Sequence, residues 1–253
     1  MEATVTTGNA PERILAIIPA YNEEASVGAV VRELTNQAPF LDILVVDDGS
    51  LDNTVKEAGA AGATVLSIPT NLGIGCAMKA GMSFALERGY DMALQVDGDG
   101  QHDPSQVHRL LEPLRSSEVD VAIGSRFLGT GGYKPPWHRR LGTLLLSAMV
   151  RAATGSKATD TTSGFRAMNR RALQFLAENY PEDYPESESL VLMHMAGIRW
   201  KEVPVMMRSR SGGTSSIRSL SSVYYMIKVM FCILLDASHV KSPRPVVQGG
   251  EQR

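Results

Sequence analysis

The chain has 253 residues, with 25 basic and 27 acidic side chains and a formal net charge of −2. Apolar residues make up 43% and charged residues 21%, which excludes a disordered or fibrous protein. The length is enough for a well-buried core and for one large α/β domain. Such a small net charge creates no overall positive field, so no nucleic-acid partner is expected and any anion must be bound by a local group of residues.

The cysteines and the N-terminal residues indicate the compartment. Cys76 and Cys232 lie far apart in apolar surroundings, which argues against a disulfide and favours a reducing environment. Residues 1–12 have neither the basic start nor the apolar run of a signal peptide. We therefore expect a flexible N-terminal tail on a cytoplasmic protein.

Strand-to-helix units follow one another along the first half of the chain. Short apolar runs within 14–20, 41–48, 63–69 and 92–96 predict strands, and helical periodicity begins near 22, 53, 75 and 104. The first helix is expected to carry Glu23 and Glu24 in its first turn. This alternation predicts an α/β fold with a mostly parallel sheet covered by helices on both faces. Ligands of such sheets bind at the carboxyl ends of the strands.

The second half is less regular. A fifth strand at 120–126 is followed by a long helix at 139–154, and after Ser163 we expect irregular chain with helices near 170–178 and 189–197 and a strand within 198–208. No internal repeat or second domain is visible. The predicted organisation is one domain at 13–217, a C-terminal amphipathic helix at 218–240 and a disordered tail at 241–253.

An acidic turn follows the fourth strand. Asp97 and Asp99 flank Gly98, and Gln101 lies two residues further on, so three oxygen-bearing side chains gather at a strand end. Carboxylate and amide oxygens suit Mg²⁺ or Mn²⁺, which take the rest of their ligands from substrate phosphates. The alternative is a solvated Asp-Gly turn, which a single D-x-D does not exclude.

A second acidic pair, Asp47 and Asp48, ends the second strand on the same edge of the sheet. Asp48 is a candidate acceptor of hydrogen bonds from a base or a ribose. The alternative is a cap for the next helix, a role that Ser50 or Asp52 fills equally well. Receiver domains of two-component signalling also carry an acidic pair, but they need it after the first strand and a lysine after the fifth, where this chain has Arg126.

The motifs in these loops resemble those of the family 2 glycosyltransferases, particularly the polyprenyl-phosphate sugar synthases such as the dolichyl-phosphate mannose synthases. They read IPAYNEE, VVDDGSLDNT, NLGIGCAMKAG, VDGDGQHDP, IGSR and TTSGFRAMNR, in family order, and the match covers roughly 13–217. The resemblance implies a GT-A (Rossmann-like) fold and an inverting, metal-dependent enzyme that uses a UDP-, GDP- or dTDP-sugar.

The resemblance also implies the donor site. The residues that would hold the nucleoside, with Tyr21 near the base, are Pro19, Tyr21, Glu23, Val46 and Asp48. The residues that would hold the ribose, the diphosphate and a Mg²⁺ or Mn²⁺ ion are Asp97, Gly98, Asp99 and Gln101, with Asp97, Asp99 and Gln101 on the metal.

For the acceptor, the resemblance implies that Arg126, Arg139 and Thr143 hold the phosphate of a polyprenyl phosphate. Arg208 and Arg210 match a mobile loop that closes over the donor diphosphate. A helix at 220–235 is apolar on much of its circumference, so it lies either in the inner membrane interface or against the core or a partner, including a second copy in a homodimer.

Two alternatives remain at the sequence level. If the acceptor is a hydroxyl of a glycan or small metabolite, the reaction needs a base, and Glu186 or Glu188 is the candidate. These two residues fit an acidic first helical turn equally well. The other alternative, a non-catalytic module that binds nucleotide-sugars, is disfavoured by the intact Asp97, Asp99 and Gln101.

Overall fold

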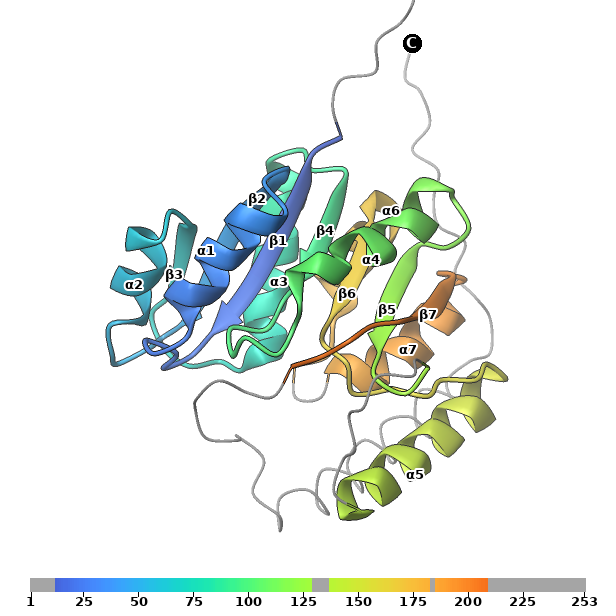
Figure 1. Ribbon diagram of the computed structural model, residues 1–253. Coiled ribbons are helices and arrows are strands. Elements are labelled where there is room, and N and C mark those ends of the chain that lie inside the picture. The colour runs from blue at the N-terminus through green and yellow to red at the C-terminus, as the bar shows by residue number, and fades with distance from the viewer. Residues whose placement is uncertain (1–11, 129–136, 183–184, 209–253) are drawn as a thin grey trace, which may run out of the picture.

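The computed structural model describes residues 12–128, 137–182 and 185–208 (Figure 1). The strands are β1 (Ile14–Ala20), β2 (Leu41–Asp48), β3 (Thr64–Ile68), β4 (Met92–Gln95), β5 (Val121–Ser125), β6 (Arg166–Asn169) and β7 (Trp200–Pro204). The helices are α1 (Val27–Gln37), α2 (Thr54–Ala60), α3 (Ile74–Glu87), α4 (Val107–Arg115), α5 (Trp137–Thr154), α6 (Arg170–Asn179) and α7 (Pro185–Met195), with a 3₁₀ turn, η1, at Pro104–Gln106. The predicted C-terminal helix at 218–240 and the tail at 241–253 lie outside the described residues.

Within the described residues the strands form one sheet in the order β3-β2-β1-β4-β6-β5-β7. Neighbouring strands are parallel except at β6, which runs antiparallel to both β4 and β5. All strands except β6 therefore end at the same edge of the sheet. The prediction of a mostly parallel α/β sheet is confirmed.

The short strand β6 was not expected, because we predicted irregular chain after Ser163. Its four residues begin with Arg166 and end with Asn169, so no apolar run marks the strand in the sequence. The strand forms because its backbone pairs with two strands from distant parts of the chain, β4 and β5. Its insertion brings the chain segment just before Arg166 to the carboxyl edge of the sheet.

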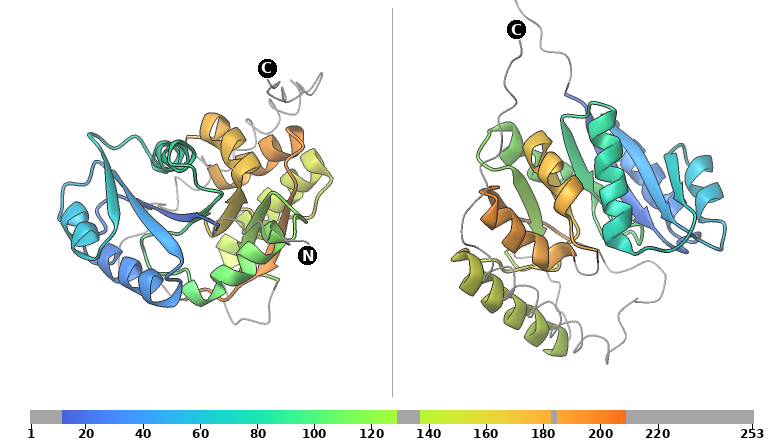
Figure 2. Two further views of the ribbon diagram at one scale, coloured as in Figure 1. Left: turned by 90° about the horizontal axis from the view of Figure 1, so that it is seen from above. Right: turned by 180° about the vertical axis from the view of Figure 1, so that it is seen from behind.

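Helices cover both faces of the sheet, as Figure 2 shows from above and from behind. Alternate residues of β1 divide between the two layers, because successive side chains of a strand point to opposite faces. Leu15 and Ile17 pack in the cluster formed by α3, α5, α6 and α7, and Ile14 and Ile18 pack in the cluster formed by α1, α2 and α4. The two clusters hold the strands rigidly and leave the loops at the carboxyl edge for binding.

Helix α1 begins at Val27, later than expected, so Glu23 and Glu24 are not in its first turn. Both glutamates lie in the loop after β1 and hold it to the loop after β2. The Glu23 backbone N–H donates to Thr54 Oγ1 at 2.8 Å, and the Glu24 carboxylate accepts from the backbone and side chain of Asn53 at 3.0 Å. Contacts between the two loops thus replace the helical turn.

Helix α5 lies beyond the carboxyl edge of the sheet and packs against α7 (Figure 1). It carries two exposed leucines, Leu144 and Leu145. No helix within the described parts of the chain is both long and apolar enough to cross a membrane.

Candidate active site at the carboxyl edge of the sheet

The loops after β1 and β4 meet at the carboxyl edge. Gly98 lies so close to β1 that a Cβ at this position would be 3.6 Å from the Pro19 carbonyl oxygen and 3.8 Å from Glu23 Cγ. Tyr21, in the same loop, has 43% of its surface exposed, which leaves its ring accessible for stacking on a base. The structure therefore places Pro19 and Glu23 beside Gly98 of the acidic turn, with Tyr21 in the same loop. Their role in a donor site stays a prediction.

Asp97 lies two residues after the end of β4 at Gln95 and faces the chain segment ahead of β6. A Cβ at Gly164 would stand 2.7 Å from Asp97 Oδ1, so only glycine leaves this carboxylate undisturbed. The side chain of Asp97 is 35% exposed and remains accessible to a ligand. Gly164 was not among the predicted site residues, although the S-G-F motif that contains it was recognised.

His102 holds the acidic turn in place through its imidazole ring. Its ring is buried and stacks on Phe165, with the ring centroids 4.6 Å apart. Nδ1 accepts from the Asp97 backbone N–H at 3.0 Å, so the ring proton lies on Nε2, which is 3.4 Å from Asp97 Oδ2. This residue was also missed, and its place directly after Gln101 was the available signal.

Asp99 is buried, with 4% of its surface exposed, and its Oδ1 accepts from the Gln101 backbone N–H at 3.0 Å. This bond closes the turn and leaves the Gln101 side chain partly exposed. The Gln101 carbonyl accepts from the Arg208 backbone N–H at 2.9 Å, so the chain after β7 crosses the turn.

Asp48 accepts hydrogen bonds from backbone groups of a neighbouring loop. Its two carboxylate oxygens accept from the backbone N–H groups of Leu72 and Gly73 at 2.9 and 2.8 Å, which holds the loop between β3 and α3 against the end of β2. It does not cap α2, because Asp52 accepts from the first N–H of that helix. The Val46 side chain is fully buried in the core. The roles of Asp48 and Val46 at the nucleoside stay predictions.

A buried polar cluster lies behind Asp97. Arg166 has 2% of its surface exposed, and its guanidinium donates to the carbonyls of Ser163 and Glu186 and to Ser189 Oγ at 2.7–2.8 Å. These bonds join the segment before β6 to the first turn of α7. Tyr180, also buried, donates to Gln95 Oε1 at 3.1 Å, and burial raises the pKa of its hydroxyl.

Glu186 lies in the first turn of α7, next to this cluster. Burial raises the pKa of its carboxyl, and the Arg166 guanidinium opposes that rise. The charge of Asp97 also raises the pKa of Glu186. Glu188 lies in the same helical turn and is partly buried.

The predicted acceptor residues are only partly described. Arg126 follows β5 at the carboxyl edge and forms an ion pair with Asp160 at 2.6 Å. Thr143 lies on α5 and is partly buried. Arg139 falls at the start of α5, where its side chain lies outside the described residues, as does all of Arg210.

Arg208 does not face the acidic turn with its side chain. Its Nη1 is 2.6 Å from Glu33 and its Nη2 is 3.0 Å from Asp103. The hydrogen bond to Glu33 and the charges of both carboxylates raise the pKa of the guanidinium. In this arrangement Arg208 holds the chain after β7 to α1, and its role at a diphosphate stays a prediction.

The acidic turn fits a divalent cation that takes most of its ligands from a substrate. Among the described residues no group of three or more His, Cys, Asp or Glu side chains is arranged to hold a metal by itself. Mg²⁺ and Mn²⁺ do not require one, because one or two carboxylates and substrate phosphates suffice. Asp97, with 35% of its side chain exposed, is accessible for this purpose.

A mostly parallel sheet with one inserted antiparallel strand, and a D-x-D turn at its carboxyl edge, define a glycosyltransferase of the GT-A fold. The family model described as "Glycosyl transferase family 2" matches residues 15–176. The chain belongs to this family.

Named relatives come from bacteria and archaea. The undecaprenyl-phosphate mannosyltransferase of Micrococcus luteus is 39% identical over 64% of this chain and 68% of its own length. The polyprenol monophosphomannose synthase of Mycolicibacterium smegmatis is 30% identical over 86% of each chain. The UDP-N-acetylglucosamine–dolichyl-phosphate N-acetylglucosaminyltransferase of Methanococcus voltae is 30% identical over 90% of this chain and all of the relative.

Among solved structures, the glucosyl-3-phosphoglycerate synthase of Mycobacterium tuberculosis, in complex with Mn²⁺, UDP-glucose and phosphoglyceric acid, superposes with a TM-score of 0.69. The alignment covers 92% of this chain and 82% of that chain at 22% sequence identity. At this identity the similarity establishes the GT-A fold and leaves the donor and acceptor open.

Proposed function

We propose that this glycosyltransferase moves a sugar from a nucleotide diphosphate sugar to a polyprenyl phosphate, with inversion at the anomeric carbon and with Mg²⁺ or Mn²⁺. The observation that carries the proposal is the accessible Asp97 carboxylate beside Asp99 at the carboxyl edge. The names of the relatives support the acceptor, since those from M. luteus, M. smegmatis and M. voltae all name a polyprenyl, polyprenol or dolichyl phosphate. The Mn²⁺ in the complex from M. tuberculosis supports the metal.

The donor lies across the loops after β1, β2 and β4. Tyr21 stacks on the base, while Asp97, Asp99 and Gln101 receive the ribose and the diphosphate. A bound cation would supply positive charge to the diphosphate as it leaves. The turn closed by Asp99 and Gln101 holds these oxygens in place before the donor arrives, so little reorganisation accompanies the reaction.

The acceptor phosphate approaches from the side of β5 and α5. Arg126, Arg139 and Thr143 hold its oxygens, and Arg208 and Arg210 are assigned to the diphosphate. For Arg208 this contact requires its guanidinium to leave Glu33 and Asp103. A phosphate monoester is already ionised at neutral pH, so its oxygen attacks the anomeric carbon without a general base. We place this reaction at the cytoplasmic face of a membrane, where a polyprenyl chain remains embedded.

The alternative acceptor is a hydroxyl of a glycan or small metabolite, with Glu186 as general base. One observation favours it: burial raises the pKa of Glu186 towards the pH at which a base works efficiently. Glu188 is the second candidate. For a lipid phosphate acceptor, neither carboxylate is required for proton transfer.

The proposed function is tested in two steps. Thermal unfolding of the full chain with UDP-, GDP- and dTDP-sugars, with Mn²⁺ and with chelator, identifies the donor, because only a bound ligand raises the midpoint. Transfer is then measured to undecaprenyl phosphate and, separately, to undecaprenol. Transfer to the phosphate alone is expected. Transfer to neither lipid, by a protein that binds a donor, contradicts the proposed acceptor.

A further inference from the structure

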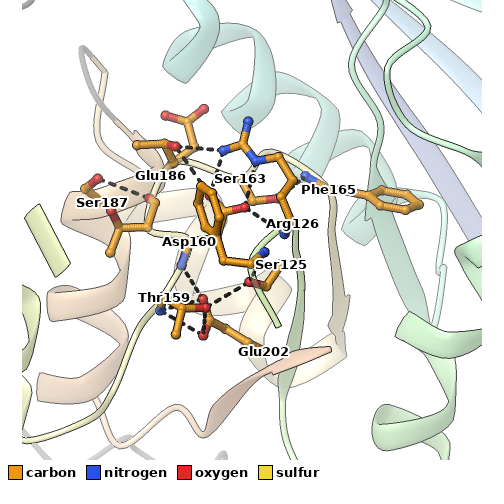
Figure 3. Close-up of polar contacts among 12 residues, drawn as sticks. Ser125, Arg126, Thr159, Asp160, Ser163, Phe165, Glu186, Ser187 and Glu202 are labelled. Carbon is orange, nitrogen blue, oxygen red and sulfur yellow. Dashed lines mark hydrogen bonds and ion pairs between the residues drawn. The ribbon is translucent and has the colours of Figure 1, made fainter. Parts of the chain in front are cut away.

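Arg126 is oriented by a single carboxylate at the carboxyl end of β5 (Figure 3). Its Nε donates to Asp160 Oδ2 at 2.7 Å and its Nη2 donates to Asp160 Oδ1 at 2.6 Å. The Arg126 backbone N–H donates to the same Oδ2 at 3.0 Å, and Nη2 also donates to Thr162 Oγ1 at 2.9 Å. Both the backbone and one edge of the guanidinium are therefore fixed before any ligand binds.

The two members of this pair differ in what they can reach. The Asp160 side chain has no exposed surface, whereas 19% of the Arg126 side chain is exposed. Asp160 therefore does not touch a ligand itself and acts through the side chains that it holds, Arg126 and Thr162. Because a buried carboxylate is costly without its cation, Arg126 is also bound to stay in this orientation.

Asp160 is itself held by a second carboxylate, Glu202 of β7. Glu202 Oε1 accepts from the Asp160 backbone N–H at 2.6 Å, and Oε2 accepts from the backbone N–H and the hydroxyl of Thr159 at 2.8 Å. Thr159 Oγ1 is in turn 2.9 Å from Ser125 Oγ at the end of β5. The segment between α5 and β6 is thus fastened to two strands of the sheet.

We propose that Asp160 and Glu202 are positioning residues for the acceptor phosphate. Glu202 fixes the backbone of Thr159 and Asp160, and Asp160 fixes the Arg126 guanidinium in the orientation that receives the phosphate oxygens. The inference rests on the proposed function, in which Arg126 binds the acceptor. It adds that the grip of Arg126 depends on two carboxylates that do not touch the acceptor.

The sign of one mutational effect separates positioning from simple neutralisation. If Asp160 only cancels the charge of Arg126, then Asp160→Asn leaves a more positive site and tightens phosphate binding. If Asp160 orients the guanidinium, the same change weakens binding, because the amide NH₂ faces the guanidinium N–H groups and breaks the two-point contact. A fixed side chain also loses less entropy when the phosphate binds.

The experiment titrates farnesyl phosphate into the full chain and compares farnesol, which lacks the phosphate. Arg126→Ala is expected to weaken farnesyl phosphate about ten- to a hundredfold, and Asp160→Asn about tenfold. Asp160→Asn in the Arg126→Ala background should have no further effect. Glu202→Gln should weaken binding in the same direction, and Glu118→Gln is the matched control, because Glu118 pairs with the neighbouring Lys201 on the surface.

Folding is checked separately, since Asp160 and Arg126 are partners in a buried pair. The Arg126→Ala, Asp160→Asn double variant removes both charges, and Glu202→Gln leaves the Arg126–Asp160 pair intact. Neither change leaves one member of this pair buried without its partner. Weaker farnesyl phosphate binding with unchanged Mn²⁺–nucleotide binding supports the inference. Unchanged or tighter binding in Asp160→Asn, beside a clear loss in Arg126→Ala, overturns the inference alone. No loss in Arg126→Ala overturns the proposed acceptor role together with it.

Discussion

Gly164 and Asp97 approach one another so closely that a Cβ on Gly164 would lie 2.7 Å from Asp97 Oδ1 and 3.2 Å from Oδ2. The pair joins the S-G-F segment before β6 to the acidic turn after β4. It places the S-G-F motif, which follows the proposed acceptor residues in the chain, next to the carboxylate that is proposed to hold the donor. The close approach is possible because glycine has no side chain, so the addition of one methyl group at this position tests it.

Gly164→Ala is expected to lower the transfer rate by about a hundredfold, because displacement of a catalytic-site group by about 1 Å has an effect of that size. The backbone of Gly164 does not have a positive φ, so the effect comes from the side chains that a Cβ would meet, Asp97 and also Gln95, whose Nε2 would lie 3.0 Å away. Gly59→Ala is the control, since a Cβ there meets nothing within 4 Å. Steady-state rates and Mn²⁺ dependence are measured for both variants. Normal rates in Gly164→Ala would show that Asp97 need not be precisely placed.

Asp99→Asn is expected to reduce turnover by more than about a hundredfold and to remove the metal-dependent part of nucleotide binding, because an amide does not supply the charge that the cation requires. The asparagine carbonyl can still accept from the Gln101 N–H, so the turn is kept. Calorimetric titration of UDP or GDP with and without Mn²⁺ measures the effect. Asp91→Asn, at an exposed carboxylate that accepts from the Arg13 N–H, is the control. Full activity in Asp99→Asn rules out the metal assignment.

The acceptor class is decided by comparing Arg139→Ala with Glu186→Gln. A phosphate acceptor needs a cation, so Arg139→Ala should lose about 1.5–3 kcal/mol of binding in the transition state, and Glu186→Gln should change the rate little. For a hydroxyl acceptor the order reverses, since loss of a general base lowers the rate by about 10²–10⁴. Hydrolysis of the donor without acceptor shows whether the donor site is intact in each variant. A Glu186→Gln enzyme that hydrolyses but cannot transfer would refute the phosphate acceptor.

Glu186 also predicts a pH-dependent stability. Because its pKa is higher in the folded chain than in the unfolded one, the folded chain binds more protons between the two values. The stability contributed by protonated Glu186 is fully present below the unfolded pKa of about 4.3 and is lost as the pH rises through the folded pKa. The difference in melting temperature between Glu186→Gln and the unmodified chain should therefore become more favourable to the variant as the pH rises from 4 to 8. Glu178→Gln, at an exposed position of α6, is the control and should have the same melting temperature as the unmodified chain at pH 4 and at pH 8. If Glu186→Gln also matches the unmodified chain at both pH values, the prediction is contradicted.

The sequence by itself determined the sheet's alternating architecture, the family and the strand ends that carry Asp48, Asp97 and Asp99. These features are local, since an apolar run followed by a polar turn specifies where a strand stops whatever it pairs with. The same local patterns correctly predicted the helices α5 and α6 and the position of β7 within a few residues. They could not predict β6, whose four residues form a strand only through pairing with β4 and β5.

Only the tertiary structure decided which partners the polar side chains take. Arg126 meets Asp160 across 34 residues of chain, and Arg208 meets Glu33 across 175. No periodicity in the sequence encodes such contacts, because they depend on the order of strands in the sheet and on which loops its carboxyl edge brings together. For the same reason the sequence shows Gly164 only as part of a motif, and its close approach to Asp97 appears only in the tertiary structure.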